Sequence, residues 1–497
     1  MNQSAWSRRS RRSIPRRLQA GGEVGEGGVV QAKPSSSAEP GQVHQPHDAK
    51  SAGPATCNAP RLTVRLNLED DAEYGLRTTP PRRARSGVPA MPQFNYEYRA
   101  SRTIEYAVLT AAACLSIYWY LQPVLSPGDP VKPRRVICSK ARQAAKLATA
   151  DSTWACSPAP RELAPSYAPD VFPGGRDVET AYGTIKVFEW GPEDGEKVLL
   201  LHGIGTPCVA LGDMAREFVR KGCRVMLFDL FGRGYSDAPS DLPYDDRLYT
   251  SQILLVLASS RIPWTGSSSF HIVGYSLGGA LAAAFAAYHA NLLRSATLIC
   301  PGGLVRPSHV SLKSRILYSE GLLPSWLVNG LARRRLEPRP GTASADIPDP
   351  SVNNVDGDDS QDVDFDQVPV CAGDASGPKV GDVVRWQLRN NAGFVPAYMS
   401  TIRNAPIYGQ HEGVWRRLSE QLALRREDEQ VPGLEGGRIC LILAERDPIV
   451  VKEEWIADSF AVLGEEAVDI RVLNGGHEIA ISKGKEVADV AMAAWRR

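Results

Sequence analysis

Residues 271–280 read HIVGYSLGGA. The apolar run before the serine is typical of a buried strand, and the small-residue run after it, LGGALAAAFAAYHA, is typical of a helix that packs closely on a sheet. Gly274, Ser276 and Gly278 fit the pattern G-x-S-x-G, in which a tight strand-to-helix turn lifts a serine hydroxyl above the sheet. We therefore predict that Ser276 is a nucleophile. The alternative is a small residue without a chemical role where a strand meets a helix.

Short apolar runs recur on both sides of this stretch and alternate with helical segments. They read GTIKVFEW (183–190), KVLLLHG (197–203), CRVMLFDLFG (223–232), SATLICPGG (295–303), RICLILAE (438–445) and VDIRVLNGG (468–476). This alternation predicts an α/β fold with a mostly parallel, doubly wound sheet that is covered on both faces. In such sheets ligands bind beyond the carboxyl ends of the strands.

A serine nucleophile needs a base that accepts its proton. His477 directly follows the last predicted strand, on the glycine-rich loop NGGHE. Of the other histidines after Ser276, His289 lies in a predicted helix, and His309 and His411 fall in or near a predicted lid. We therefore predict His477 as the base.

The base needs an acid that orients it, and Glu445 and Asp447 both follow the strand RICLILAE. Asp447 precedes a proline, which suits a turn that exposes the carboxylate, whereas Glu445 could form a surface pair with Arg446. We prefer Asp447, whose expected role is to hold the imidazole tautomer and stabilise the imidazolium.

Negative charge that develops on a substrate oxygen needs two preorganised backbone donors. The N–H of Leu277, beside the nucleophile, is one candidate. The second is expected on the loop after KVLLLHG, where we favour Ile204 over Gly205. His202 on the same loop is expected to brace it, with a catalytic role as the alternative.

About 130 residues separate the strand runs that end near 303 and begin near 438. We predict a helical lid over about 304–436, inserted before the acid-bearing strand, with a disordered acidic loop over about 338–382. Residues 346–378 hold nine aspartates and no basic residue. The glycine and glutamate of a calcium-binding EF-hand loop are not in register there, so a solvated loop is favoured.

The N-terminal third of the chain has a different composition. Residues 1–100 are rich in Ser, Gly, Pro and Arg and are predicted to be a disordered basic tail, with a transit peptide as the alternative for the first twenty. Residues 104–126 are a candidate transmembrane helix, because no charge occurs from Tyr106 to Gly128. A buried or amphipathic helix is the alternative. Residues 127–174 are predicted to be a linker.

The charged residues and the cysteines limit the expected cellular location and the expected partners of the protein. Two basic residues precede the candidate span and five follow it within 20 residues, which predicts a single-pass protein with its C-terminal domain in the cytosol. A mitochondrial location is the alternative. The nine cysteines include no CxxC pair, which argues against a zinc site. We predict no metal and no cofactor. A net charge of +1 predicts no nucleic-acid partner.

Five motifs together resemble the α/β-hydrolase superfamily, in its serine-nucleophile esterase and lipase-like branch. They are LLLHGIG (199–205), FDLFGRGYSD (228–237), GYSLGG (274–279), AERDPIV (444–450) and NGGHE (474–478). The resemblance implies a hydrolase domain over 175–497, with Ser276 as nucleophile, Asp447 as acid, His477 as base, and Ile204 and Leu277 as oxyanion donors. It also implies a structural turn at D-x-x-G-x-G-x-S, formed by Asp229, Gly232, Gly234 and Ser236. A departure is Ala444, where many members have glycine.

The resemblance also limits which reactions the chain is expected to catalyse. Serine at the turn argues against the epoxide-hydrolase and dehalogenase branches, and the lack of an HGGPG run argues against the proline-iminopeptidase branch. We predict acyl transfer through Ser276 by a carboxylesterase or lipase. The apolar lid segments FVPAYM and LLPSWLV and the candidate membrane anchor favour a small hydrophobic ester or lipid and an association with a membrane. The alternatives are a carbon–carbon-bond, thioester or amide hydrolase, or a non-catalytic binding protein.

Overall fold

A computed structural model describes residues 96–125, 136–143, 166–267, 269–338, 365–370 and 377–496 of the chain. The predictions for residues 1–95 and for most of the acidic loop lie outside these residues. Helix α1, Tyr96–Leu125, begins inside the segment predicted to be a tail. Its window Ile104–Leu121 is long and apolar enough to cross a membrane, by length and composition.

The described part of the hydrolase domain holds an eight-stranded sheet in the order β10-β9-β8-β7-β4-β5-β3-β2. Neighbouring strands from β10 to β5 are parallel, whereas β2 and β3 run antiparallel to their neighbours. The strands are β2 Arg176–Thr180, β3 Gly183–Trp190, β4 Lys197–Leu201, β5 Arg224–Phe228, β7 Phe270–Tyr275, β8 Leu293–Ile299, β9 Ile439–Ala444 and β10 Val468–Leu473. The predicted mostly parallel sheet is confirmed, and β2 is an addition to it.

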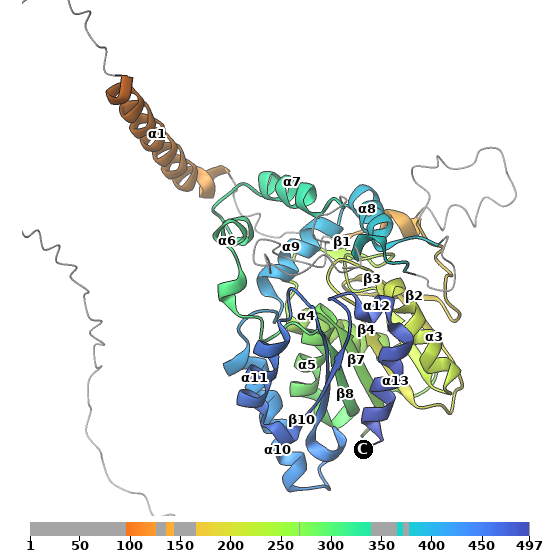
Figure 1. The fold of residues 1–497 in the computed structure, drawn as a ribbon. Coiled ribbons are helices and arrows are strands. Elements are labelled where there is room, and N and C mark those ends of the chain that lie inside the picture. The colour runs from red at the N-terminus through yellow and green to blue at the C-terminus, as the bar shows by residue number, and fades with distance from the viewer. Residues whose placement is uncertain are drawn as a thin grey trace, which may run out of the picture. The chain divides into compact units, whose positions relative to one another are not determined.

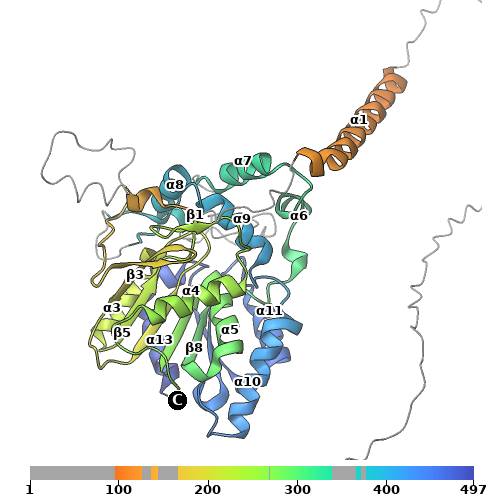
Figure 2. The same ribbon diagram turned by 180° about the vertical axis from the view of Figure 1, so that it is seen from behind.

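Helices cover both faces of the sheet (Figures 1 and 2). On one face α3 and α13 pack against each other and the sheet, with the short α12 beside them, and on the other face α5 packs on β7 and β8 between α4 and α10. These helices are α3 Gly212–Arg220, α4 Asp246–Ala258, α5 Leu277–His289, α10 Arg416–Glu427, α11 Lys452–Leu463, α12 Ile479–Ser482 and α13 Gly484–Trp495. The arrangement is the predicted doubly wound one, because strands buried on both faces need helices on both sides.

The segment between β8 and α10 carries helices that lie over the carboxyl ends of the strands (Figure 1). They are α6 Leu312–Tyr318, α7 Ser325–Leu336, α8 Val380–Asn390 and α9 Phe394–Asn404. The predicted range 304–436 also includes α10, which packs on α5 and so belongs to the layer that covers the sheet. Helical spacing alone does not separate α10 from the helices before it, because both kinds of helix bury one face.

Part of the stretch predicted as a disordered acidic loop is ordered. Residues 365–370 read FDQVPV, and Phe365, Val368 and Val370 are buried. Pro369 forms a β-bridge with Lys379, one residue before α8 begins. The apolar side chains of this segment explain the order, since burying them offsets the entropy of fixing the chain.

Two pieces of the predicted linker 127–174 are also ordered parts of the domain. Strand β1, Val136–Ile137, pairs antiparallel with β6, Ala238–Pro239. Beyond it, Arg142 Nη2 lies 2.8 Å from Asp237 Oδ2 in a buried ion pair. Residues 166–174 add the buried rings of Tyr167 and Phe172.

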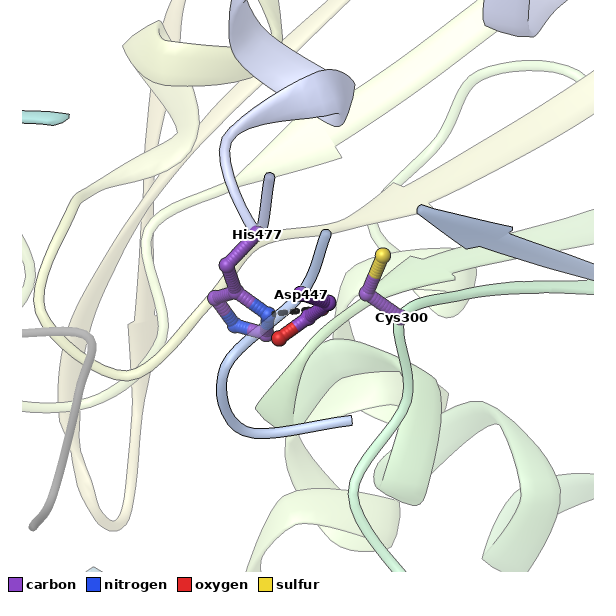
Figure 3. Close-up of side chains that lie close together, drawn as sticks. All are labelled: Cys300, Asp447 and His477. Carbon is purple, nitrogen blue, oxygen red and sulfur yellow. Dashed lines mark hydrogen bonds and ion pairs between the residues drawn. The ribbon is translucent and has the colours of Figure 1, made fainter. Parts of the chain in front are cut away.

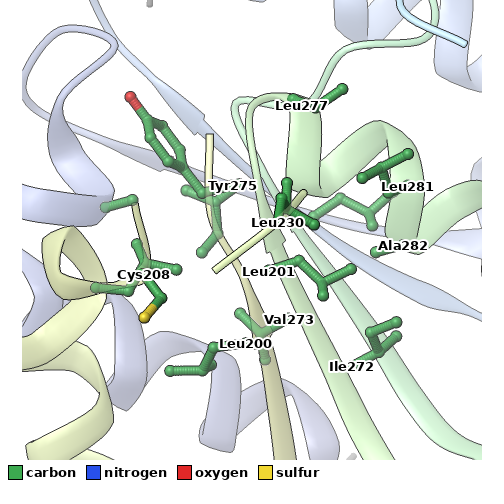
Figure 4. Packing of buried hydrophobic residues seen from close by; sticks show 14 of the residues in the cluster. Leu200, Leu201, Cys208, Leu230, Ile272, Val273, Tyr275, Leu277, Leu281 and Ala282 are labelled. Atoms are coloured by element: carbon green, nitrogen blue, oxygen red, sulfur yellow. The ribbon is translucent and has the colours of Figure 1, made fainter. Parts of the chain in front are cut away.

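The core continues directly below the serine turn (Figure 4). Leu201 on β4, Val273 on β7 and Leu281 on α5 are among its members, each at most 2% exposed. A fully buried leucine or valine stabilises the fold by about 1.5–3 kcal/mol. The turn therefore rests on a close-packed base that fixes its position.

Candidate active site

Ser276 occupies a sharp turn between β7 and α5. Its backbone has φ 54° and ψ −115°, a left-handed conformation that costs a non-glycine residue about 1–3 kcal/mol. A Cβ on Gly274 would lie 2.1 Å from the carbonyl oxygen of Gly278, and one on Gly278 would lie 2.2 Å from that of Leu201. The glycines at both ends of G-x-S-x-G are therefore required by contact with the backbone.

His477 and Asp447 meet Ser276 at the carboxyl edge of the sheet, although 201 residues separate the serine from the histidine. His477 Nε2 lies 3.0 Å from Ser276 Oγ, and His477 Nδ1 lies 2.6 Å from Asp447 Oδ2. The serine is 9% exposed and the other two side chains are buried. The three residues thus form a continuous hydrogen-bonded chain that can move a proton from the hydroxyl to the imidazole.

The carboxylate of Asp447 is fixed from two sides. Its Oδ1 accepts hydrogen bonds from the backbone N–H of Ile449 at 2.8 Å and of Val450 at 2.9 Å. Burial by itself raises the pKa of Asp447, but the neighbouring His477 and the hydrogen bonds to its oxygens outweigh burial, and the pKa lies below its ordinary value. The group is therefore a carboxylate at neutral pH, able to stabilise an imidazolium.

The other carboxylate and the other histidines considered for these roles do not contact Ser276. The exposed carboxylate of Glu445 pairs with Lys452. His309 lies 3.1 Å from Glu454 and His411 lies 3.4 Å from Asp458, both on α11. His289 is the last residue of α5, at the opposite end of that helix from Ser276.

A narrow pocket opens at the serine, with a volume of about 30 Å³. Its lining is mostly apolar and consists of Ile204, Ser276, Leu277, Cys300, Gly302, Val305, Ile407, Tyr408, Ile449, Val450 and His477. Both oxyanion-donor candidates, Ile204 and Leu277, are in this lining. No arginine or lysine is among the described residues that line it.

The loop that carries Ile204 is braced by buried polar groups. Arg233 is fully buried and its Nε donates to the carbonyl oxygen of Ile204 at 3.1 Å. The N–H of Leu230 donates to His202 Nε2 at 2.8 Å, which leaves the ring proton on Nδ1, 2.8 Å from the carbonyl oxygen of Gly203. Burial lowers the pKa of His202 to about 3, so this ring stays neutral and holds the loop.

The turn D-x-x-G-x-G-x-S has a structural role of the same kind. Asp229 is buried and its two carboxylate oxygens accept from the N–H of Cys208 at 2.9 Å and of Tyr235 at 2.8 Å. Ser236 Oγ donates to the carbonyl oxygen of Asp229 at 2.7 Å. None of these groups lines the described pocket.

Cys300, at the end of β8, is a neighbour of the site that the sequence did not point to (Figure 3). Its sulfur, a nitrogen of His477 and an oxygen of Asp447 all lie within 4.8 Å of one another. Burial, and next the charge of Asp447, raise the pKa of this thiol well above its usual value. Cysteine, histidine and aspartate can bind a metal, but His477 already uses both ring nitrogens in hydrogen bonds to Ser276 and Asp447.

Known proteins resemble parts of the chain. It is 29% identical over 147 residues to "Probable lysophospholipase BODYGUARD 4" of Arabidopsis thaliana, which covers 29% of this chain and 31% of that protein. It is 30% identical over 120 residues to "Monoacylglycerol lipase abhd6-A" of Xenopus laevis, covering 24% and 34%. The matches thus span about a third of the length of these two relatives.

A third relative is matched over more of its length. "2-Hydroxymuconate semialdehyde hydrolase" of Pseudomonas putida is 29% identical over 225 residues, covering 41% of this chain and 76% of that protein. The sequence model of the alpha/beta hydrolase family matches residues 198–490, a range that includes the serine turn, the loop of Asp447 and the loop of His477. This chain belongs to the alpha/beta hydrolase family.

Proposed function

We propose that the chain is a serine hydrolase that cleaves carboxylic esters of neutral, apolar acyl groups, with Ser276 as nucleophile, His477 as base and Asp447 as the orienting acid. The observation that carries the proposal is the hydrogen-bonded chain from Ser276 Oγ to His477 at 3.0 Å and from His477 to Asp447 at 2.6 Å. A serine hydroxyl is a weak nucleophile unless a base of this kind removes its proton.

The reaction follows from the positions of these groups. Ser276 Oγ attacks the ester carbonyl carbon while its proton passes to His477 Nε2, and the carbonyl oxygen becomes an oxyanion that accepts from the N–H of Ile204 and Leu277. Asp447 stabilises the imidazolium, which then gives its proton to the departing alcohol as the C–O bond breaks. A water molecule repeats the sequence on the acyl-enzyme and releases the acid.

The lining of the pocket supports a neutral apolar acyl group. Aliphatic side chains such as Val305, Ile407 and Ile449 surround the serine, and no described lining residue carries a positive charge. A substrate with a carboxylate near the reacting carbon would lose its hydration there without gaining a cationic partner. Two of the relatives are named a lysophospholipase and a monoacylglycerol lipase, so a lipid ester with one acyl chain is the substrate class we favour.

The volume of the pocket adds a requirement for motion. A cavity of about 30 Å³ holds only about two or three water molecules. An acyl chain is larger than this, so side chains that line the pocket must move to admit it.

The match to 2-hydroxymuconate semialdehyde hydrolase favours a second candidate, the hydrolysis of a bond other than an ester. That substrate carries a carboxylate and has no ester bond. The absence of cationic side chains from the described lining makes it the weaker candidate. The two candidates differ in whether the purified protein turns over the semialdehyde or a monoacyl lipid.

We also propose that α1 anchors the protein in a membrane with the hydrolase domain on the cytosolic side. The support is the apolar window Ile104–Leu121 and the excess of basic residues after it. Protease treatment of sealed vesicles tests this orientation, because only a domain on the outer, cytosolic face is digested.

A fluorophosphonate probe tests the nucleophile. We expect the wild-type protein to be labelled on Ser276 and Ser276→Ala to be unlabelled, with circular dichroism showing that the variant is folded. Equal labelling of both proteins, or no labelling of the wild type, would overturn the proposal. A panel of monoacylglycerol, lysophospholipid, p-nitrophenyl butyrate and the semialdehyde then assigns the substrate class.

A further inference from the structure

The lid carries an unusual concentration of exposed large apolar side chains. Outside α1, nine such side chains occur in the described part of the chain, and five of them fall within residues 312–331. Leu312 and Trp326 are each 73% exposed, and Leu331, Ile316 and Leu322 are between 42% and 45% exposed. Single exposed apolar residues are common, but a cluster indicates a surface that binds something.

The helices α6 and α7 and their connection carry this cluster on exposed residues. In α7, Val328, Ala332 and Leu336 recur every four residues and are buried, whereas Trp326 and Arg333 lie two turns apart on the exposed face. In α6 only Ser314 is buried. We call this exposed part of α6, α7 and their connection, residues 312–334, the α6–α7 surface.

The two helices are held as one unit on the lid. Arg335 Nη1 donates to Ser314 Oγ at 2.9 Å, which joins α7 to α6, and its guanidinium lies 5.7 Å from the ring centre of Tyr318. Arg403 on α9 donates to the carbonyl oxygen of Tyr318 at 2.7 Å. The apolar side chains are thus displayed by a fixed scaffold.

Positive charge accompanies the apolar side chains. Residues 312–334 contain Lys313, Arg315, Arg333 and Arg334, against the single acidic residue Glu320. Lys313 and Arg333 are exposed and flank the apolar cluster on α6 and α7. Exposed tryptophan and leucine together with lysine and arginine are the side chains that bind the boundary between the acyl chains and anionic headgroups of a bilayer.

The α6–α7 surface is connected to the lining of the pocket by short segments of the chain. Val305, which lines the pocket, stands seven residues before Leu312, and Tyr408 lies four residues after α9, which contacts both α6 and α7. Figures 1 and 2 both show α6 and α7 at the outer end of the domain, on the far side of α9 from the sheet, with α10 at the opposite end.

We propose that the α6–α7 surface docks on a bilayer that contains anionic lipids. Docking places Leu312 and Trp326 at the acyl boundary and Lys313 and Arg333 among the headgroups. This inference goes beyond the proposed ester hydrolysis, and the two are measured separately.

Hydrogen–deuterium exchange of the full-length protein tests the docking without reference to activity. The protein is compared in detergent, in phosphatidylcholine vesicles and in vesicles that also contain phosphatidylserine. We expect the backbone amides of residues 312–334 to be protected in vesicles, and most strongly with phosphatidylserine. Each lysine or arginine near an anionic surface contributes about fivefold, so Lys313→Gln with Arg333→Gln should lower this protection by about that factor per residue.

The apolar contribution is tested by Leu312→Ser with Trp326→Ser, which should abolish the protection in both kinds of vesicle. Leu424→Ser with Arg438→Gln is the matched control, because both residues are exposed and lie outside residues 312–334, on α10 and directly before β9. It should leave protection unchanged. Hydrolysis of soluble p-nitrophenyl butyrate should be the same in all variants, and its absence would count against the proposed function only.

Equal exchange of residues 312–334 in detergent and in vesicles would overturn the docking. So would protection that appears in detergent and rises with protein concentration, since that result assigns the surface to a second copy of the chain. Protection in vesicles that survives both the serine and the glutamine substitutions would also contradict the proposal.

Discussion

Replacing Asp447 by asparagine tests the role of the orienting acid alone, because the new side chain has nearly the same shape. The two backbone N–H donors of Ile449 and Val450 both point at Oδ1. The amide oxygen of asparagine takes that position, which leaves its NH₂ group facing His477 Nδ1 at the position of Oδ2. The imidazole must then accept at Nδ1 and carry its proton on Nε2, where it faces Ser276 Oγ and cannot act as a base.

The size of the effect follows from the tautomer. The side chain keeps its volume and its two backbone hydrogen bonds, so the fold and the pocket stay as they are. An imidazole held in the wrong tautomer lowers kcat by about 10⁴-fold in enzymes that use this chemistry. That factor corresponds to a barrier higher by about 5 kcal/mol. KM should change little, because Asp447 does not contact an acyl group in the pocket.

The assay is the steady-state hydrolysis of p-nitrophenyl butyrate by the full-length protein, with the unfolding transition measured alongside. Glu445→Gln is the matched control, because this carboxylate is two residues away and pairs with Lys452 on the surface. It should retain kcat within about twofold. If Asp447→Asn keeps a tenth of the wild-type kcat, or if Glu445→Gln loses as much as Asp447→Asn, the assignment of the acid is wrong.

Three further predictions concern the serine turn, a buried ion pair and a buried histidine. Gly278→Ala places a Cβ 2.2 Å from the carbonyl oxygen of Leu201, so fluorophosphonate labelling should be lost and the unfolding temperature should drop; wild-type labelling would contradict the required close contact. Arg142→Ala leaves Asp237 buried without its ion pair and should lower the free energy of unfolding in urea by about 3 kcal/mol, whereas an unchanged value would show that this ion pair does not stabilise the domain. Burial lowers the pKa of His271 from 6.5 to about 3, so the unfolded chain binds a proton below pH 6.5 that the native state does not, and stability falls as pH drops from 7 to 5 by about 2 kcal/mol for this residue. His271→Gln should remove that part of the pH dependence of urea unfolding, and an identical pH dependence in both proteins would refute the buried neutral histidine.

Much of the candidate site can be predicted from short segments of the sequence. A Cβ at Gly278 would lie 2.2 Å from a backbone oxygen, so only glycine fits this position of the serine turn. The glycine in the sequence therefore predicts the turn before the fold is known. Each predicted apolar run overlaps one strand of the observed sheet. Strands buried on both faces, such as β7 and β9, must be apolar throughout. The loop of His477 was found for the same reason, since it directly follows the last such run.

Other features depend on contacts between distant parts of the chain. Glu445 and Asp447 stand two residues apart in the same loop, and only the position of His477 decides which carboxylate meets the ring. Cys300 joins the site because β8 and β9 are neighbours in the sheet, although about 140 residues separate them.

The sequence by itself determined the α/β fold, the serine turn and the loop that carries the histidine, because each of these needs particular residues within a few positions of one another. The tertiary structure alone decided that α10 covers the sheet, that residues 136–143 join the domain through Arg142 and Asp237, and that α6 and α7 leave Leu312 and Trp326 exposed. The physical reason is that the burial or pairing of a residue depends on which other segment packs against it. A helix or a charged residue has the same local pattern whether or not another segment packs against it.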